Sequence, residues 1–216
     1  MHIPDGFIST GTAAATWAIS AGGVGYAVRR VNQELDEKRV PLMGVTAAFI
    51  FAAQMLNFTV VGGTSGHLLG GALAAILLGP WAGTLVLTAV LIVQALLFQD
   101  GGLLALGANV LNMALVGVLV GWVVYTGLKR LLGERSWATM VSSFAAAWLS
   151  VVVASLVASA ELALSGTSPW VVVLPAMGLT HMLIGIGEGL ITVAVVAFLR
   201  VTRPDLLALR QASSQA

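Results

Sequence analysis

The sequence predicts an all-α integral membrane protein with seven transmembrane helices, built as a single membrane domain over residues 1–216. Composition is the first observation: 58% of the residues are hydrophobic and only 9% are charged, whereas roughly 25% of an average soluble domain is charged. The second observation is length, because apolar segments of about 20 residues, each enough for one crossing, take up almost the whole chain. The third is the placement of charge, since every Lys and Arg falls into one of three short stretches.

Residues 1–9, M-H-I-P-D-G-F-I-S, precede the first apolar segment. They lack the positive flank and apolar core of a cleavable signal peptide, so we expect the terminus to be retained. His2 is too bulky for removal of the initiator methionine, which leaves Met1 with a free amine. The Pro4–Gly6 stretch favours a turn, which would allow this segment to fold back into the helix bundle.

The apolar segments and the charges between them predict the seven helices. The predicted helices cover residues 10–28, 41–58, 68–79, 81–98, 107–128, 137–164 and 170–199. Gly79-Pro80 separates the third segment from the fourth, so residues 68–98 form either one crossing or two. The basic clusters are Arg29, Arg30, Lys38 and Arg39, then Lys129, Arg130 and Arg135, then Arg200, Arg203 and Arg210. Two crossings place all three clusters on one side. Because Lys and Arg favour the cytoplasm, we predict an outside N-terminus and a cytoplasmic C-terminus.

A glycine-rich passage, V-G-G-T-S-G-H-L-L-G-G at Val61–Gly71, lies between apolar segments on the predicted outer side. Glycine at this density disfavours a continuous helix. Irregular backbone at membrane depth occurs only where protein or a water-lined cavity shields it. The passage contains His67, one of three histidines. A single histidine among apolar neighbours is more often a packed residue than a ligand, so His67 indicates a metal site only together with a second ligand.

The N-terminus can supply that second ligand. The Met1 amine, the His2 amide nitrogen and His2 Nδ1 can close a five-membered and a six-membered chelate ring around one ion, and His67 would complete a square of nitrogens. Such a set suits Ni²⁺, Cu²⁺ and Co²⁺, because Mg²⁺ and Ca²⁺ prefer oxygen and Zn²⁺ prefers a tetrahedron. The sequence has no cysteine, so thiolate sites are excluded. From these residues alone, the metal site and the packed histidine are both open interpretations.

Four motifs resemble a known family. They are M-H-I-P-D-G-F at Met1–Phe7, N-F-T-V-V-G-G-T-S-G-H-L-L-G-G at Asn57–Gly71, F-Q-D-G-G-L-L-A-L-G-A-N-V-L-N-M-A at Phe98–Ala114 and H-M-L-I-G-I-G-E at His181–Glu188. In this order and over essentially the whole chain, they closely resemble the CbiM/NikM family, the substrate-binding membrane subunits (S components) of energy-coupling-factor (ECF) ABC transporters for cobalt and nickel. The resemblance implies a seven-helix fold and a metal ion bound by Met1, His2 and His67. Thr59-Val60-Val61 departs from the proline-containing stretch of many relatives, but it removes no ligand.

The resemblance also implies a function. As a non-catalytic subunit in a bacterial or archaeal cytoplasmic membrane, the protein would capture Co²⁺, which we favour, or Ni²⁺ with high affinity, and would supply cobalt for cobalamin synthesis. It would work with a transmembrane CbiQ-like T component, paired cytoplasmic CbiO-like ATPases and a small CbiN-like membrane subunit. The chain has no G-x-x-x-x-G-K-[ST] P-loop, so we expect ATP hydrolysis in partner subunits. We expect no nucleic acid partner and no cofactor besides the transported ion.

Several polar residues are expected to support the metal site. The first group either orients the His67 ring or satisfies loop backbone groups: Asn57, Thr64 and Ser65. The second group resembles family-typical positions that line the site or pin the terminal segment: Gln94, Asp100, Asn109 and Asn112. His181 and Glu188 lie seven residues apart, on one face of the last helix. We favour mutual satisfaction of this pair over direct contact of His181 with the metal.

Two rival functions are open to the same residues. A stand-alone secondary transporter or channel would use His181 and Glu188 as an ion relay, and it would transport metal under a proton gradient without an ATPase. An intramembrane metalloenzyme would use the histidines to activate water, and chelation would abolish its proteolysis. The enzyme is poorly supported, because the sequence has no H-E-x-x-H motif and four nitrogens in a plane leave no obvious position for substrate beside a bound water.

Overall fold

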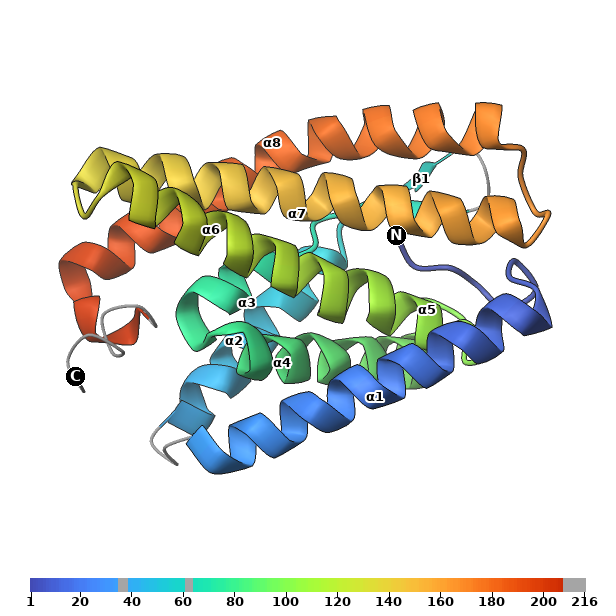
Figure 1. Ribbon diagram of the computed structural model, residues 1–216, viewed down its shortest axis with the longest axis horizontal. Coiled ribbons are helices and arrows are strands. Elements are labelled where there is room, and N and C mark those ends of the chain that lie inside the picture. The colour runs from blue at the N-terminus through green and yellow to red at the C-terminus, as the bar shows by residue number, and fades with distance from the viewer. Residues whose placement is uncertain (35–38, 61–63, 208–216) are drawn as a thin grey trace.

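In the computed structural model, the chain forms a bundle of seven helical rods (Figure 1). The structure describes residues 1–34, 39–60 and 64–207. Five rods are single helices: α1 (Thr10–Glu34), α2 (Val40–Gln54), α3 (Gly71–Leu78), α7 (Ser136–Leu164) and α8 (Trp170–Thr202), the last followed by the 3-10 turn η4 (Pro204–Leu206). The other two rods are composite. One is α4 (Pro80–Val93) continued by the π-helix η2 (Gln94–Phe98), and the other is α5 (Leu106–Asn109) continued by the π-helix η3 (Val110–Gly117) and then by α6 (Val118–Leu132). The prediction of seven helices is confirmed in this part of the chain.

The helices differ in whether they are long enough to cross a membrane. Within the described ranges, four helices are long and apolar enough to cross: Pro80–Phe98, Leu106–Leu132, Ser136–Leu164 and Trp170–Thr202. In contrast, α3 has eight residues, all of them buried, and it is only about 12 Å long at 1.5 Å per residue. That length covers less than half of a hydrocarbon core about 30 Å thick. The third predicted helix therefore exists, but it is a core helix packed against α4, α6 and α7.

The largest departure from the prediction is a β-hairpin. Strand β1 (Asn57–Val60) pairs antiparallel with β2 (Thr64–His67), and Asn57 lies opposite His67. Helix α2 consequently ends at Gln54, not at residue 58, and the fold is not purely α-helical. The sequence F-T-V within β1 consists of aromatic and β-branched residues, which favour strands, although hydropathy alone extends the preceding helix to Phe58.

Other helix ends differ from the prediction where hydropathy is a poor guide. Helix α1 continues to Glu34 instead of ending at residue 28, because the polar residues after the apolar stretch are compatible with a helix. Helix α3 begins at Gly71 instead of residue 68, because Gly70 adopts a φ of +78°. Glycine enters this left-handed conformation at little cost, so Gly70 ends the hairpin connection and starts the helix.

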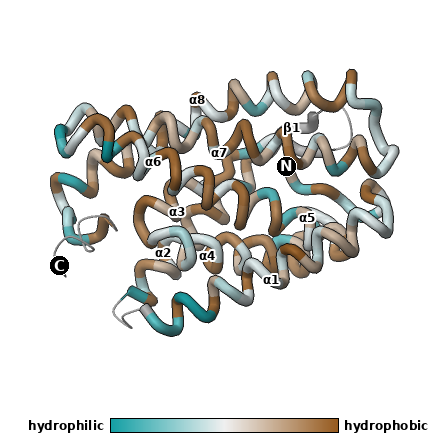
Figure 2. The backbone as a smooth tube through the Cα atoms, in the orientation of Figure 1, coloured by the Kyte–Doolittle hydropathy of each residue, from teal (hydrophilic) through white to brown (hydrophobic). Residues whose placement is uncertain are grey.

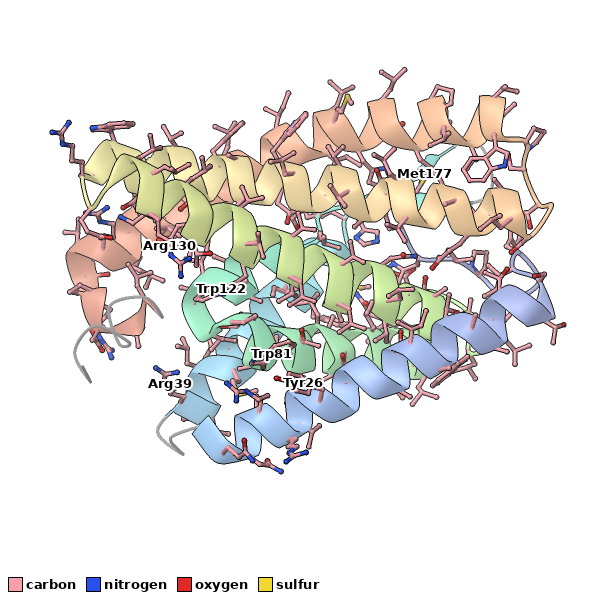
Figure 3. The ribbon with its side chains drawn as sticks, in the orientation of Figure 1. Tyr26, Arg39, Trp81, Trp122, Arg130 and Met177 are labelled. Atoms are coloured by element: carbon pink, nitrogen blue, oxygen red, sulfur yellow. The ribbon has the colours of Figure 1, made fainter. Side chains whose placement is uncertain are left out.

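The two ends of the bundle differ in charge. Figure 2 shows apolar residues along most of the helix lengths, with strongly hydrophilic residues at the end where α1 and α8 terminate. We call this the basic end, because the described Lys and Arg residues lie at the end of α1, the start of α2, the α6–α7 turn and the end of α8. Figure 3 shows Arg39 and Arg130 there, and Met177 toward the opposite end. Lys38 and Arg210 of the predicted clusters lie outside the described residues.

Candidate metal site

The N-terminal segment, defined here as residues 1–8, begins inside the protein. Met1 and Ile3 are fully buried, and His2 is 4% exposed. Figure 1 shows the N-terminus next to α7 in this view, with the segment running from there to the start of α1. Chain ends are usually disordered unless other parts of the protein tie them down. Because the segment precedes the first helix, its backbone polar groups need partners elsewhere, and those partners define its position.

Asn109 binds the backbone of the N-terminal segment in the way a neighbouring strand would. The Ile3 N–H donates to Asn109 Oδ1 at 2.8 Å, and Asn109 Nδ2 donates to the Ile3 carbonyl at 3.1 Å. The Gly102 N–H donates to the same carbonyl at 2.9 Å. Asn109 is the last residue of α5 and directly precedes the π-helix η3, a widened helix type that is frequent at functional sites. Asn109 therefore pins the segment.

Asp5 forms a second attachment, which the sequence analysis did not foresee. Its carboxylate accepts hydrogen bonds from the N–H groups of Leu103 at 3.0 Å, Leu104 at 2.8 Å and Ala105 at 3.1 Å. Gly102 passes so close to Asp5 that a Cβ atom would overlap the Asp5 side chain and backbone. Only glycine fits there. The sequence signal for this role was the presence of an acidic residue, Asp5, in a segment expected to fold into a membrane domain, because ionisable groups there are usually paired or functional.

His2 lies between an amide and a carboxylate. Its Nε2 is 3.0 Å from Gln94 Oε1, and its Nδ1 is 3.3 Å from Asp100 Oδ1. An amide oxygen only accepts hydrogen bonds, so the proton of the neutral ring lies on Nε2 and the lone pair lies on Nδ1. Nδ1 is the atom that can close a chelate with the Met1 amine. The nearby Asp100 carboxylate favours a positive charge at this position.

His67, the last residue of β2, faces His2. The two ring centroids are 4.4 Å apart, with an angle of 24° between the ring planes. His67 Nδ1–H donates to the Leu68 carbonyl at 2.7 Å, which leaves the lone pair on Nε2. That Nε2 is buried and has no hydrogen-bond partner in the part of the chain that the structure describes. A buried unpaired polar group costs about 1–3 kcal/mol, and a cation bound at Nε2 would remove this cost.

Burial keeps the nitrogen donors unprotonated. Desolvation lowers the pKa of the Met1 amine from 8.0 to about 4, against the opposing charge of Asp100. Desolvation, reinforced by the charge of the amine, lowers the pKa of His2 from 6.5 to about 3. The pKa of His67 is lowered well below 6.5 by desolvation first, then by the amine and His2, with a smaller effect of His181. At neutral pH these groups are therefore uncharged nitrogen donors, the form in which such groups can bind transition metals.

The arrangement can bind a metal ion only through a mixed donor set. Among the described residues, no three His, Cys, Asp or Glu side chains lie close enough together to hold one. A metal site at this position has to combine the two imidazoles with main-chain nitrogen. The Met1 amine and the His2 amide are the main-chain nitrogens next to them.

The remaining predicted residues take different positions. Asn57 pairs with His67 across the hairpin, and Thr64 and Ser65 precede His67 in β2. The side chains of these three residues lie outside the described part of the structure. Asn112 does not hold the N-terminal segment, because its amide donates to Glu161 Oε2 on α7 at 2.6 Å.

His181 and Glu188 do not satisfy each other, contrary to our expectation. His181 Nδ1–H donates to the Met177 carbonyl at 2.8 Å. Glu188 accepts hydrogen bonds from the N–H groups of Leu69 at 2.5 Å and Gly70 at 2.8 Å. Both side chains are on one face of α8, but seven residues span about 10 Å of helix. No hydrogen bond or ion pair between the two is found in the described ranges, because this distance is too long for direct contact.

Gln54 is a further residue near the site that was not predicted from the sequence. This residue at the end of α2 is fully buried. Its Nε2 donates to the Leu69 carbonyl at 2.7 Å, and its Oε1 accepts from Gln94 Nε2 at 2.9 Å. A primary amide inside an otherwise apolar predicted span was the signal that could have identified it, because such groups hydrogen-bond across helices.

Comparisons with known proteins agree on one family. Residues 2–206 match the family model of CbiM, described as the cobalt uptake substrate-specific transmembrane region. A putative fused nickel transport protein NikMN of Archaeoglobus fulgidus is 44% identical over 209 residues, which cover 96% of this chain and 68% of the relative. The cobalt transport protein CbiM of Geobacter sulfurreducens is 34% identical over 215 residues, which cover 96% of this chain and 62% of the relative.

A solved structure supports the same assignment. The crystal structure of a truncated transition metal transporter superimposes with a TM-score of 0.86 at 36% sequence identity, covering 94% of this chain and 99% of the other. The match thus extends over sequence, fold and nearly the full length of the chain. The resemblance predicted from the four motifs is confirmed, and the chain belongs to the CbiM/NikM family of cobalt and nickel transport membrane proteins.

Proposed function

We propose that this protein is the substrate-binding S component of an ATP-driven ECF importer and that it captures Co²⁺, or Ni²⁺, with high affinity in a flat site of four nitrogens. Family membership makes the chain a multi-pass, non-catalytic transport protein for cobalt or nickel in the cytoplasmic membrane. The proposal adds the ligands, which are the Met1 amine, the amide nitrogen and Nδ1 of His2, and Nε2 of His67. We also propose that the protein prefers Co²⁺ and that the imported cobalt is used for cobalamin synthesis.

One observation carries the proposal: a chain terminus is buried beside two imidazoles, and both imidazoles have the tautomer that a metal needs. Burying an amine and two histidines at this depth is costly without compensation. A bound cation provides the compensation for all three groups at once. The planar nitrogen set suits Co²⁺ and Ni²⁺ and disfavours Mg²⁺, Ca²⁺ and Zn²⁺.

The orientation and the partners are also proposals. The described basic residues gather at the end of the bundle away from the site, which supports a cytoplasmic basic end and a metal site that faces outside. Relatives described as fused NikMN proteins support a small CbiN-like partner. From the family we infer a CbiQ-like T component and CbiO-like ATPases, which would reorient this subunit and drive release of the ion.

The ligand assignment is tested with purified protein in detergent, using a chromogenic chelator that competes for Co²⁺ or Ni²⁺. We expect His2→Ala and His67→Ala to abolish high-affinity binding of both ions while the variants elute and melt as folded protein. Cellular Co²⁺ uptake with the partner subunits present should be lost in the same variants. Unchanged binding in either variant would refute the assignment, and a tighter complex with Ni²⁺ than with Co²⁺ would overturn the preference for cobalt.

A further inference from the structure

A continuous chain of hydrogen bonds leads away from His2 through two buried amides. His2 Nε2 donates to Gln94 Oε1 at 3.0 Å, Gln94 Nε2 donates to Gln54 Oε1 at 2.9 Å, and Gln54 Nε2 donates to the Leu69 carbonyl at 2.7 Å. Both glutamines are fully buried. Gln94 is the first residue of the π-helix η2, and Gln54 is the last residue of α2. The chain of hydrogen bonds therefore connects the N-terminal segment with two helices, η2 and α2.

The same chain continues through one peptide group to α8. The Leu69 carbonyl and the Gly70 N–H belong to a single peptide unit, and this N–H donates to Glu188 Oε1 at 2.8 Å. The other oxygen of Glu188 accepts from the Leu69 N–H at 2.5 Å. Two accepting oxygens are the pattern of an ionised carboxylate. Counted from the imidazole, three amide groups lie between the ring and the carboxylate.

The direction of every bond in this chain is forced. A backbone carbonyl only accepts, so Gln54 must present its NH₂ group to Leu69 and its oxygen to Gln94. Gln94 must then donate to Gln54 and present its own oxygen to His2. The His2 ring must donate through Nε2, which leaves the lone pair on Nδ1. The Leu69 carbonyl, at the other end of this chain of hydrogen bonds, thus sets the tautomer of His2.

The geometry points to Glu188 as a positioning residue for metal capture: through Gln54 and Gln94 it orients and strengthens His2 as a ligand, and through the Leu69 and Gly70 N–H groups it holds His67 in place. This inference rests on the proposed function and assigns Glu188 no contact with the metal ion. It also differs from an ion relay, because no ion or proton has to move along the chain.

Known behaviour of hydrogen-bond networks supports the assignment. A metal-bound histidine commonly donates its other N–H to a carboxylate or carbonyl, which fixes the ring and raises its basicity. Here three amides are interposed, and each bond in a low-dielectric interior polarises the next. The carboxylate at the end makes the terminal bonds charge-assisted and therefore stronger. The effect on His2 is transmitted without any direct contact.

The position of Glu188 also links both histidine ligands to one helix. Among the four long apolar helices of the described chain, α8 is the least buried, so its outer surface is little restrained by the rest of the bundle. A shift of α8 relative to α2 and α4 would disturb the hydrogen-bond chain to His2 and the segment after His67 together. Capture and release of the ion would thereby depend on the position of α8.

The test measures Ni²⁺ affinity and the d–d absorption band of the Ni²⁺ complex in purified protein, because the band reports the strength of the ligands in the bound fraction. We expect Glu188→Gln to weaken Ni²⁺ binding by about 10- to 100-fold and to move the band to longer wavelength. Gln54→Leu leaves Glu188 and all proposed ligands in place but interrupts the chain, and it should shift the band in the same direction. The double variant should lose no more than the larger single loss.

The matched control is Glu161→Gln, a buried glutamate of α7 whose carboxylate accepts from Asn112 at 2.6 Å and lies outside the chain of hydrogen bonds that starts at His2. It should leave the band unchanged and the affinity within about twofold. A merely structural role of Glu188 predicts weaker binding with an unmoved band and additive losses in the double variant, and that result overturns the inference. So does a band shift in the control. If Glu188→Gln fails to fold, the band position of Gln54→Leu decides instead, and an unmoved band in that variant overturns the inference. Wild-type protein that binds neither Ni²⁺ nor Co²⁺ overturns the proposed function itself, which is a separate result.

Discussion

The N-terminal segment and α8 both contribute to the candidate site, yet they are held in place to different degrees by polar and apolar contacts. The segment precedes the first helix. Hydrogen bonds of Asp5 tie it to the loop after η2, and the pair of hydrogen bonds between Ile3 and Asn109 ties it to α5. Helix α8 has 33 residues, and much of its surface consists of exposed apolar side chains. The position of the segment depends on individual polar contacts together with the buried side chains of Met1 and Ile3, whereas that of α8 depends on a long apolar surface and on a few inward residues. Small changes should therefore matter far more in the first region than on most of the second.

Adding one alanine before Met1 should have the largest effect. The Met1 side chain is fully buried, so an extra residue has no space, and the chelating amine becomes an amide. We expect Co²⁺ and Ni²⁺ affinity to fall at least about a thousandfold, equivalent to about 4 kcal/mol, in the chelator competition assay. The same alanine added at the C-terminus is the control and should change nothing. Affinity within tenfold of wild type would show that the terminal amine is not a ligand.

Gly102→Ala should have the next largest effect, because it acts on the attachment of the segment and leaves every ligand in place. The new Cβ would overlap Asp5, and overpacking of this kind costs about 1–3 kcal/mol or more. We expect roughly 100-fold weaker Ni²⁺ binding. Gly127→Ala on α6 is the matched control, since nothing lies within 4 Å of its added Cβ. Equal affinities of the two variants would mean that docking of the segment does not limit binding.

Acid should loosen the segment to a smaller degree. In the undocked segment the Met1 amine has a pKa of 8.0 and His2 a pKa of 6.5, whereas burial in the docked segment lowers these pKa values to about 4 and about 3. The undocked state binds more protons in this window, so stability rises with pH and is lost as pH falls from 8 toward 4. We expect the metal-free protein to melt about 2–4 °C or more lower at about pH 5 than at about pH 8. The variant with an extra alanine should show a smaller drop, and a melting temperature that rises on acidification would contradict the burial of neutral amine.

Leu183→Ala on α8 should have the smallest effect. This side chain is 72% exposed, and exposed substitutions usually change stability by less than about 0.5 kcal/mol. Ni²⁺ affinity and melting temperature should match those of wild type. A tenfold loss of affinity would remove the contrast between the outward surface of α8 and its inward face.

Much of the fold could be predicted because hydropathy and charge act locally. Apolar length identified the helices, and the pair Gly79-Pro80 separated α3 from α4. The hairpin was missed, because the apolar segment of α2 runs on to Phe58 in β1 and the pairing of β1 with β2 is a tertiary contact that hydropathy does not show. Hydropathy also could not show that α3 is buried on all sides, since lipid and protein interior favour the same side chains.

The nitrogen donors of the candidate site could be proposed from the sequence, whereas most of the residues that hold them in place could not. Met1, His2 and His67 came from chelate chemistry and from family motifs, whereas Asp5 and Gln54 act through contacts with residues far away in sequence. Glu188 was correctly placed on the face of α8 that carries His181, but its partners are backbone N–H groups, which no side-chain pattern reveals. Contacts of this kind depend on the tertiary fold, and a single sequence carries no local signal for them.

The anchoring of Leu69 by Glu188, 119 residues further along the chain, has a consequence for biosynthesis. A nascent polypeptide that still lacks α8 already has its amino end and its β-hairpin, but it lacks Glu188, which accepts from the N–H groups of Leu69 and Gly70 directly after the hairpin. We expect binding at full affinity only after the ribosome has released the final long helix into the bilayer. Synthesis and insertion would thus be complete before the protein retains the ion tightly.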